Sequence, residues 1–206
     1  MKGRTFNALN FPHKVAVDPN FRFDTQPFQK EGVEFNSITS DQYFIQKGHE
    51  EKFDIMFLDG LHTFRQIFRD FCNSLLCAMD NTVWLIDDVM PLDAYTAHPD
   101  QGQARNLRER AGLPVGVGWH GDVFKVVFAI HDFFPMLQYV TLTEKNGQLL
   151  IWKPAKPKYE PPVFNSLEAI ERMTFFDLMA HENVLRLTKE QHGLSVFAET
   201  KRPNLE

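Results

Sequence analysis

Three acidic side chains and a histidine stand where apolar segments of the chain end. Asp59 follows the run "FDIMFL", and His62 comes three residues later. Asp87 and Asp88 follow a second apolar run, "NTVWLI". Carboxylates are the hard oxygen ligands that Mg²⁺ prefers, so Asp59, Asp87 and Asp88 are candidate ligands of a magnesium ion. A metal held there would lower the pKa of a substrate hydroxyl and orient it.

Each of these residues also has a simpler structural interpretation. An aspartate that follows a strand often caps the next helix. His62 could act as a general base with a pKa near neutrality, or it could only pair with a nearby acid. Asp18, which ends the run "KVAV", could accept hydrogen bonds from both hydroxyls of a ribose, or Asp-Pro could simply form a turn. The residues alone leave these alternatives open.

The stretch "GWHGDVFK" at residues 118–125 gathers further polar side chains. Its glycines predict a flexible segment that could cover a site as a lid, with His120 or Asp122 facing a substrate. Asp122 could equally cap a helix that begins after it.

The elements that must position these residues follow from apolar periodicity. Strand-like runs alternate with helical stripes, and an alternating pair of runs around Asn146-Gly147 predicts a β-hairpin. The expected strands end near 18, 58 and 86, and a further short strand lies before residue 40. Helices are expected from 40, from 63, near 101–111 and after 122. The hairpin is expected at 137–153, and more helices after a Pro-rich strap at 154–162. This order predicts an α/β protein with a mostly parallel sheet covered by helices on both faces. Ligands of such sheets bind at the carboxyl ends of the strands, where the acids stand.

Composition limits the partners. The chain of 206 residues carries a formal net charge of −5 and has no Lys/Arg-rich run, so we expect neither nucleic acid nor an anionic membrane as its main partner. No apolar stretch reaches membrane-spanning length and the N-terminus lacks a signal-peptide core, so a cytoplasmic protein is expected. Association into a homo-oligomer is left open.

The motifs "KVAVDP", "ITSDQYF", "FDIMFLDGLHTFRQIFRDFCNSL", "WLIDDVMP" and "GDVFK" occur in this order. Together they resemble the class I S-adenosylmethionine-dependent methyltransferases, closest to a bacterial branch found among glycan and natural-product genes. The resemblance implies a Rossmann-like domain over residues 1–153 with an antiparallel hairpin at the edge of its sheet. Residues 154–206 are expected to form a strap and a helical extension.

The resemblance also implies roles for individual residues. Asp18 falls where the family binds the ribose hydroxyls, Ser40 and Asp41 fall near the adenine, and Asp59 falls beside the sulfonium and the acceptor. Asp59, Asp87 and Asp88 match the places where metal-dependent O-methyltransferases of sugars and catechols hold Mg²⁺. Asp59 and His62 are then the expected catalytic residues, and the acceptor is a small polar molecule such as a sugar.

The start of the chain departs from the family pattern. A central first strand and a Gly-rich turn should precede "VAVDP", but only "MKGRTFNAL" stands there. Gly3 corresponds to the last glycine of that turn. The first strand is therefore expected to be missing, through truncation, through a late assigned start, or because another segment fills its place. The run "LSVFAE" at 194–199 is the spare strand that could do so.

Three hypotheses for the whole protein follow. The first is an S-adenosylmethionine-dependent O-methyltransferase, assisted by Mg²⁺. The second is a non-catalytic or truncated methyltransferase-like domain that serves in binding or as a scaffold, which the missing strand favours. The third, a metal-dependent hydrolase, lacks a recognisable His-rich ligand set.

Overall fold

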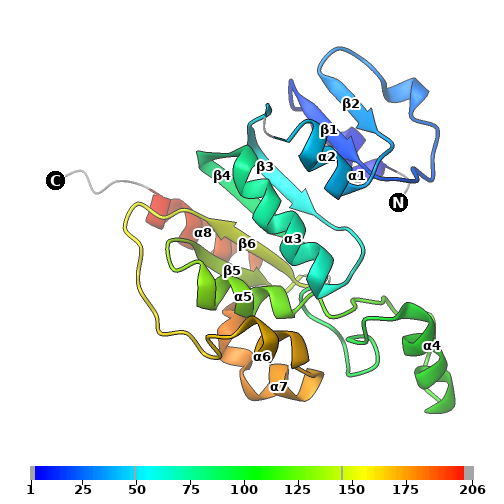
Figure 1. The fold of residues 1–206 in the computed structure, drawn as a ribbon, viewed down its shortest axis with the longest axis vertical. Coiled ribbons are helices and arrows are strands. Elements are labelled where there is room, and N and C mark those ends of the chain that lie inside the picture. Colours follow the sequence, from blue (N-terminus) through cyan, green and yellow to red (C-terminus); the bar gives the residue numbers. More distant parts are fainter. Residues whose placement is uncertain (1–2, 49, 145, 202–206) are drawn as a thin grey trace. The chain divides into compact units, whose positions relative to one another are not determined.

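The computed structural model describes residues 3–48, 50–144 and 146–201 of a mixed α/β protein (Figure 1). The chain forms two compact units, one of residues 1–52 and 73–77 and one of residues 53–72 and 78–206. Within the described residues every helix is too short or too polar to cross a lipid bilayer.

The first unit is built around a pair of parallel strands. Its elements before residue 52 are α1 (Arg4–Ala8), β1 (Lys14–Val17), η1 (Gln26–Phe28), β2 (Val33–Asn36) and α2 (Ser40–Gln46). Strands β1 and β2 pair in register from Lys14 opposite Val33. The helix predicted from residue 40 begins there, because Thr39 and Gln42 form a capping box that satisfies its first N–H groups.

The second unit contains a five-stranded sheet in the order β3-β4-β6-β5-β7. Its strands are β3 (Phe53–Leu58), β4 (Ala78–Ile86), β5 (Gln138–Leu142), β6 (Gln148–Trp152) and β7 (Leu187–Thr188). Strand β4 runs parallel to β3, and β7 runs parallel to β5. Strand β6 is antiparallel to both of its neighbours, β4 and β5. A reversed strand is thus inserted between two strands that run in the same direction.

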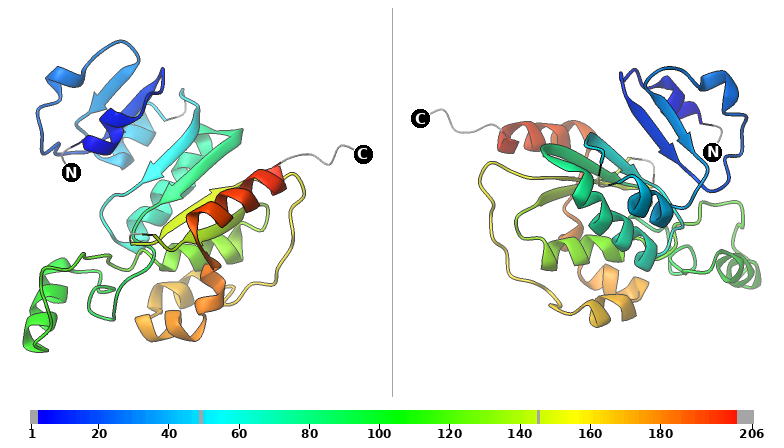
Figure 2. Two further views of the ribbon diagram at one scale, coloured as in Figure 1. Left: turned by 180° about the vertical axis from the view of Figure 1, so that it is seen from behind. Right: turned by 45° about the horizontal axis from the view of Figure 1, so that its top comes forward.

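Helices cover both faces of this sheet (Figure 2). The remaining elements are α3 (Phe64–Ser74), η2 (Leu75–Cys77), α4 (Gln101–Arg110), α5 (Lys125–Phe133), α6 (Leu167–Arg172), α7 (Phe175–Ala180), η3 (Glu182–Leu185) and α8 (Glu190–Lys201). On one face, Phe71 of α3 packs edge-on against Trp84 of β4, with ring centroids 5.9 Å apart. On the other face, Val196 and Phe197 of α8 pack on the buried Trp152 and its neighbours. The alternation of apolar side chains along β4, β5 and β6 supplies both faces.

The prediction of a strand at "LSVFAE" is wrong, because these residues lie inside helix α8. The edge beside β5 is already occupied by β7, whereas the apolar face of β5 and β6 needs a cover. A helix buries that face: Phe197 meets Trp152 at 5.6 Å between ring centroids, and the Trp152 Nε1–H donates to Thr200 Oγ1 at 2.9 Å. Gly193 lets the helix approach closely, since a Cβ there would lie 2.6 Å from Leu142 Cδ2.

Candidate functional site

Three of the polar side chains at the strand ends converge in the second unit. Asp59 follows β3, His62 lies in the turn after it, and Asp88 follows β4. One ligand atom from each lies within 4.8 Å of the others, a spacing that suits a bound metal ion. The two strand ends are tied together by the backbone, since the Asp87 N–H donates to Leu58 O at 3.1 Å.

The imidazole of His62 lies between the two carboxylates. Its Nε2 is 3.4 Å from Asp59 Oδ1, and its Nδ1 is 3.2 Å from Asp88 Oδ2. The side chains of Asp59 and Asp88 are only 8% and 9% exposed, so these charges are screened little by water. A fourth polar group, His120 Nε2, is 3.9 Å from Asp88 Oδ1.

The backbone at this site is in an uncommon conformation. His62 and Asp88 both have positive φ angles, 56° and 60°. Asp and His adopt this region more readily than most residues, but it still stores strain that the surroundings must hold. The turn between β5 and β6 provides such a hold, because Gly147 O accepts from Val89 N–H at 3.2 Å and Asn146 O accepts from Met90 N–H at 3.1 Å.

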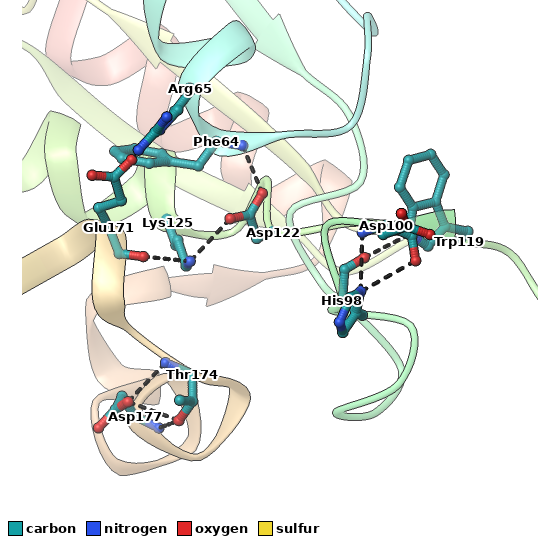
Figure 3. A network of polar contacts seen from close by, with 10 residues as sticks. All are labelled: Phe64, Arg65, His98, Asp100, Trp119, Asp122, Lys125, Glu171, Thr174 and Asp177. Atoms are coloured by element: carbon teal, nitrogen blue, oxygen red, sulfur yellow. Dashed lines mark hydrogen bonds and ion pairs between the residues drawn. The ribbon is translucent and has the colours of Figure 1, made fainter. Parts of the chain in front are cut away.

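The segment "GWHGDVFK" packs directly on His62. The indole of Trp119 stacks on the imidazole, with centroids 5.2 Å apart and planes 10° from parallel. The backbone oxygen of Trp119 is 3.0 Å from His62 Nδ1. The indole Nε1–H of Trp119 donates to His98 O at 2.7 Å (Figure 3). Gly121 approaches His62 so closely that an added Cβ would lie 1.7 Å from His62 O.

The carboxylate of Asp122 is occupied by Phe64 and Lys125 (Figure 3). Its Oδ1 accepts from the backbone N–H of Phe64, the first residue of α3, at 2.7 Å. Its Oδ2 accepts from Lys125 Nζ at 2.9 Å, and the same ammonium donates to Glu171 O at 2.7 Å. Asp122 therefore caps α3, the helix that follows His62, whereas the N-cap residue of α5 is Phe124.

Replacing Asp122 by alanine is expected to destabilise the second unit by about 3 kcal/mol, because the buried Lys125 ammonium then loses the carboxylate of its ion pair and keeps only the hydrogen bond to Glu171 O. Asp122→Asn should cost less, since its oxygen still accepts from Phe64. The free energy of unfolding, followed by tryptophan fluorescence, measures both, because Trp84, Trp119 and Trp152 all lie in this unit. An Asp122→Asn protein as stable as the parent would contradict the proposed role of the charge.

Burial and mutual proximity shift the pKa values of these groups. Burial raises the pKa of Asp88 to about 6, although the charge of His62 and a hydrogen bond from Asn146 act against it. Burial also raises the pKa of Asp87. The hydrogen bond with Asp59 raises the pKa of His62 in spite of its burial. Burial and the neighbouring His62 charge lower the pKa of His120.

In the absence of metal, the second unit is therefore expected to lose stability as the pH rises from about 4 through the raised folded pKa values of Asp88 and His62. The penalty for ionised Asp88 is complete above its folded pKa of about 6 and disappears as the pH falls towards its unfolded value. The stabilisation by protonated His62 is complete below about pH 6.5 and is lost as the pH rises through its raised folded pKa. His120 has a lowered pKa, so its contribution to stability increases as the pH rises, opposite to those of Asp88 and His62. A variant is therefore needed to separate the contribution of Asp88.

Asp88→Asn isolates the contribution of the carboxylate and keeps a residue type that tolerates positive φ. In buffer with EDTA we expect this variant to be more stable than the parent at pH 8, by about 1–3 kcal/mol, because a shift of about two pKa units has that size. The difference should vanish towards pH 4. Chemical denaturation at several pH values measures it, and a variant less stable than the parent at pH 8 would contradict the prediction.

A further observation indicates that the cluster of Asp59, His62 and Asp88 could bind a divalent cation. Asp59 Oδ2 is buried and, among the described residues, has no hydrogen-bond partner. An unpaired buried carboxylate oxygen is costly, and a bound cation would satisfy it. Two carboxylates and one imidazole suit Mn²⁺ or another first-row ion as well as Mg²⁺, since imidazole is a nitrogen ligand.

The predicted magnesium ligands are only partly brought together. Asp59 and Asp88 belong to the cluster, whereas Asp87 does not. An oxygen of Asp87 accepts instead from the N–H of Asp88 at 3.1 Å and from Gln148 Nε2 at 3.4 Å. His62, predicted as a catalytic base, takes the third place in the cluster.

The predicted cofactor residues other than Asp59 lie in the first unit. Gly3 has a φ of 62° and precedes α1. Asp18 follows β1, and its Oδ1 accepts from Asn20 N–H at 2.7 Å, the turn interaction that was its alternative interpretation. Ser40 and Asp41 form the first turn of α2. Their roles in binding S-adenosylmethionine stay predictions.

The contribution of Trp119 and Gly121 could not be read from the sequence. The sequence points to their neighbours His120 and Asp122, but only the fold brings Trp119 onto His62. No protein-family model matches the chain, and the comparison with curated proteins found no match.

Proposed function

We propose that the protein is an S-adenosylmethionine-dependent O-methyltransferase whose acceptor hydroxyl binds at the cluster of Asp59, His62 and Asp88 together with a divalent cation. The observation that carries the proposal is the convergence of these three side chains at the ends of two adjacent parallel strands. The resemblance places the acceptor and the metal of the methyltransferases at the same two strand ends.

The strand arrangement supports the same proposal. The resemblance implies a sheet with an antiparallel hairpin at its edge. Strands β5 and β6 pair antiparallel beside β4, but the two-residue strand β7 lies outside β5, so the hairpin is not the outermost part of the sheet. The parallel pair β1–β2 corresponds to the family strands that carry Asp18 and precede Ser40. A Rossmann-like identity is part of the proposal.

In this proposal the residues of the cluster position and deprotonate the acceptor. Asp59 and Asp88 would hold the cation, which would lower the pKa of a bound hydroxyl. His62, kept in place by the stacked Trp119, would either complete the ligand set or accept the hydroxyl proton. S-adenosylmethionine would supply an activated methyl group, and its transfer depends chiefly on alignment with the acceptor oxygen.

Two measurements on the same protein test the proposal. Isothermal titration with S-adenosylhomocysteine measures the cofactor site, and transfer of a radiolabelled methyl group to a panel of sugars and catechols, with and without EDTA, measures the reaction. We expect binding, and transfer that EDTA suppresses. The absence of S-adenosylhomocysteine binding would refute the proposal.

A second candidate is a non-catalytic, methyltransferase-like binding or scaffold domain. One observation favours it: among the described residues, β1 and β2 form a sheet of their own that is not hydrogen-bonded to the five-stranded sheet. In the methyltransferases that the chain resembles, a central first strand joins the strands that correspond to β1 and β2 to the rest of the sheet. Tight metal binding without binding of S-adenosylhomocysteine would favour this second candidate.

A further inference from the structure

The polar contacts of the His62 ring bear on the two roles that the proposed function leaves open for this side chain. Its Nδ1 lies 3.0 Å from the backbone oxygen of Trp119, with Asp88 Oδ2 as a second acceptor at 3.2 Å. A carbonyl oxygen can only accept a hydrogen bond, so Nδ1 must carry a proton to form this contact. In a neutral imidazole the other ring nitrogen, Nε2, then has a free lone pair.

The free lone pair of Nε2 faces another acceptor. Nε2 is 3.4 Å from Asp59 Oδ1, and an ionised carboxylate offers only lone pairs. Two lone pairs that face each other in a buried site repel, so a positive centre must lie between these two atoms. That centre is either a proton on Nε2 or a metal ion.

The remaining groups of the cluster favour the metal ion over the proton. A proton on Nε2 would satisfy Asp59 Oδ1 but not Asp59 Oδ2, which is buried and has no hydrogen-bond partner among the described residues. A metal ion can be bound by both oxygens of one carboxylate. An imidazolium also brings one positive charge to two buried carboxylates, whereas a divalent ion neutralises Asp59 and Asp88 together.

The imidazole is held as histidine ligands of metals usually are. Such a histidine donates its other ring N–H to a backbone carbonyl or a carboxylate, which fixes the tautomer and the direction of the ligating nitrogen. His62 has both kinds of acceptor at Nδ1. The indole of Trp119 stacks on the ring at 5.2 Å between centroids and keeps its plane. Nε2 is therefore oriented before an ion binds.

We infer that His62 is a ligand of the bound ion through Nε2, together with Asp59 and Asp88, and that this nitrogen makes the site prefer a first-row transition-metal ion such as Mn²⁺ or Co²⁺ to Mg²⁺. The inference rests on the divalent cation of the proposed function. Imidazole suits transition-metal ions, whereas Mg²⁺ prefers oxygen ligands. A nitrogen that binds the ion cannot also accept a proton from the acceptor hydroxyl, so His62 is not the general base.

Calorimetric titration of the full chain with CoCl₂ and MgCl₂ tests the preference. Co²⁺ should bind the parent at least about tenfold more tightly than Mg²⁺ does. His62→Asp replaces the nitrogen by oxygen and keeps a residue type that tolerates the φ of 56° at this position. This variant should reduce the ratio of the two affinities at least about tenfold, because the third carboxylate strengthens Mg²⁺ binding and the lost nitrogen weakens Co²⁺ binding.

Electron spin echo spectroscopy of Mn²⁺ bound to the parent gives a second readout that does not depend on a variant. A ligating imidazole should produce a nitrogen coupling in the spectrum. His192→Asp is the matched control, because it makes the same change in charge at an exposed histidine of α8 outside the cluster. The ratio of affinities in this variant should equal that of the parent.

The outcomes separate this inference from the proposed function. If the parent binds none of the three ions, the metal centre of the proposed function fails and the inference fails with it. If Mg²⁺ binds the parent as tightly as Co²⁺, if the Mn²⁺ spectrum lacks a nitrogen coupling, or if His62→Asp shifts the ratio no more than His192→Asp does, the inference alone is overturned. Binding of S-adenosylhomocysteine is measured independently of all three results.

Discussion

Asp59→Asn is expected to lower the affinity of the protein for Mn²⁺ and Mg²⁺ by at least about a hundredfold, since even partners of metal ligands cost 10–100-fold when they are replaced. Asp59 supplies one of the two carboxylates of the cluster, and its Oδ2 has no partner among the described residues. An amide keeps the shape but removes the charge that attracts the cation. Calorimetric titration with MnCl₂ and MgCl₂ measures the loss.

Asp54→Asn provides the control for this experiment. Asp54 lies on the same strand β3 but is exposed and outside the cluster, so its replacement should leave both affinities unchanged. If Asp59→Asn binds Mn²⁺ as tightly as the parent does, the metal centre is refuted. A loss in both variants would assign the effect to the net charge of the protein instead.

Gly121→Ala is expected to destabilise the second unit by about 3 kcal/mol or more and to abolish metal binding. Gly121 has a φ of 64°, and an added Cβ would lie 1.7 Å from His62 O and 2.9 Å from His62 C. The clash is with backbone, which cannot rotate away as a side chain can. The turn that carries His62 must therefore move, and the spacing of the cluster is lost with it.

Tryptophan fluorescence in urea measures the stability of Gly121→Ala, and titration with MnCl₂ measures its site. Gly116→Ala is the control, because Gly116 lies in the same loop and a Cβ there meets nothing within 4 Å. That variant should match the parent or be slightly more stable, since alanine restricts the unfolded chain. A Gly121→Ala protein that binds Mn²⁺ normally would show that the contact with His62 is dispensable.

The sequence predicted the elements that have strong local signals. The strand ends at Leu58 and Ile86 follow from apolar runs stopped by acids, and the start of α2 at Ser40 follows from cap chemistry. The run "LSVFAE" at 194–199 predicts a strand but lies in helix α8 (Glu190–Lys201), because so short an apolar run has no periodicity that separates strand from helix. These residues form a helix because Val196 and Phe197 then cover the apolar face of β5 and β6, which is a tertiary contact.

For the candidate site, too, some features follow from the sequence and others only from the tertiary structure. By itself the sequence determined which acids end strands, since the end of an apolar run and the residue type there are local properties. Asp59 and Asp88 then meet because β3 and β4 are adjacent and parallel. The tertiary structure alone decided that His62 joins them while Asp87 does not, because left-handed turns at His62 and Asp88 set where the side chains point. It also decided that Trp119 and Gly121 hold His62, a contact across almost sixty residues that no local pattern encodes.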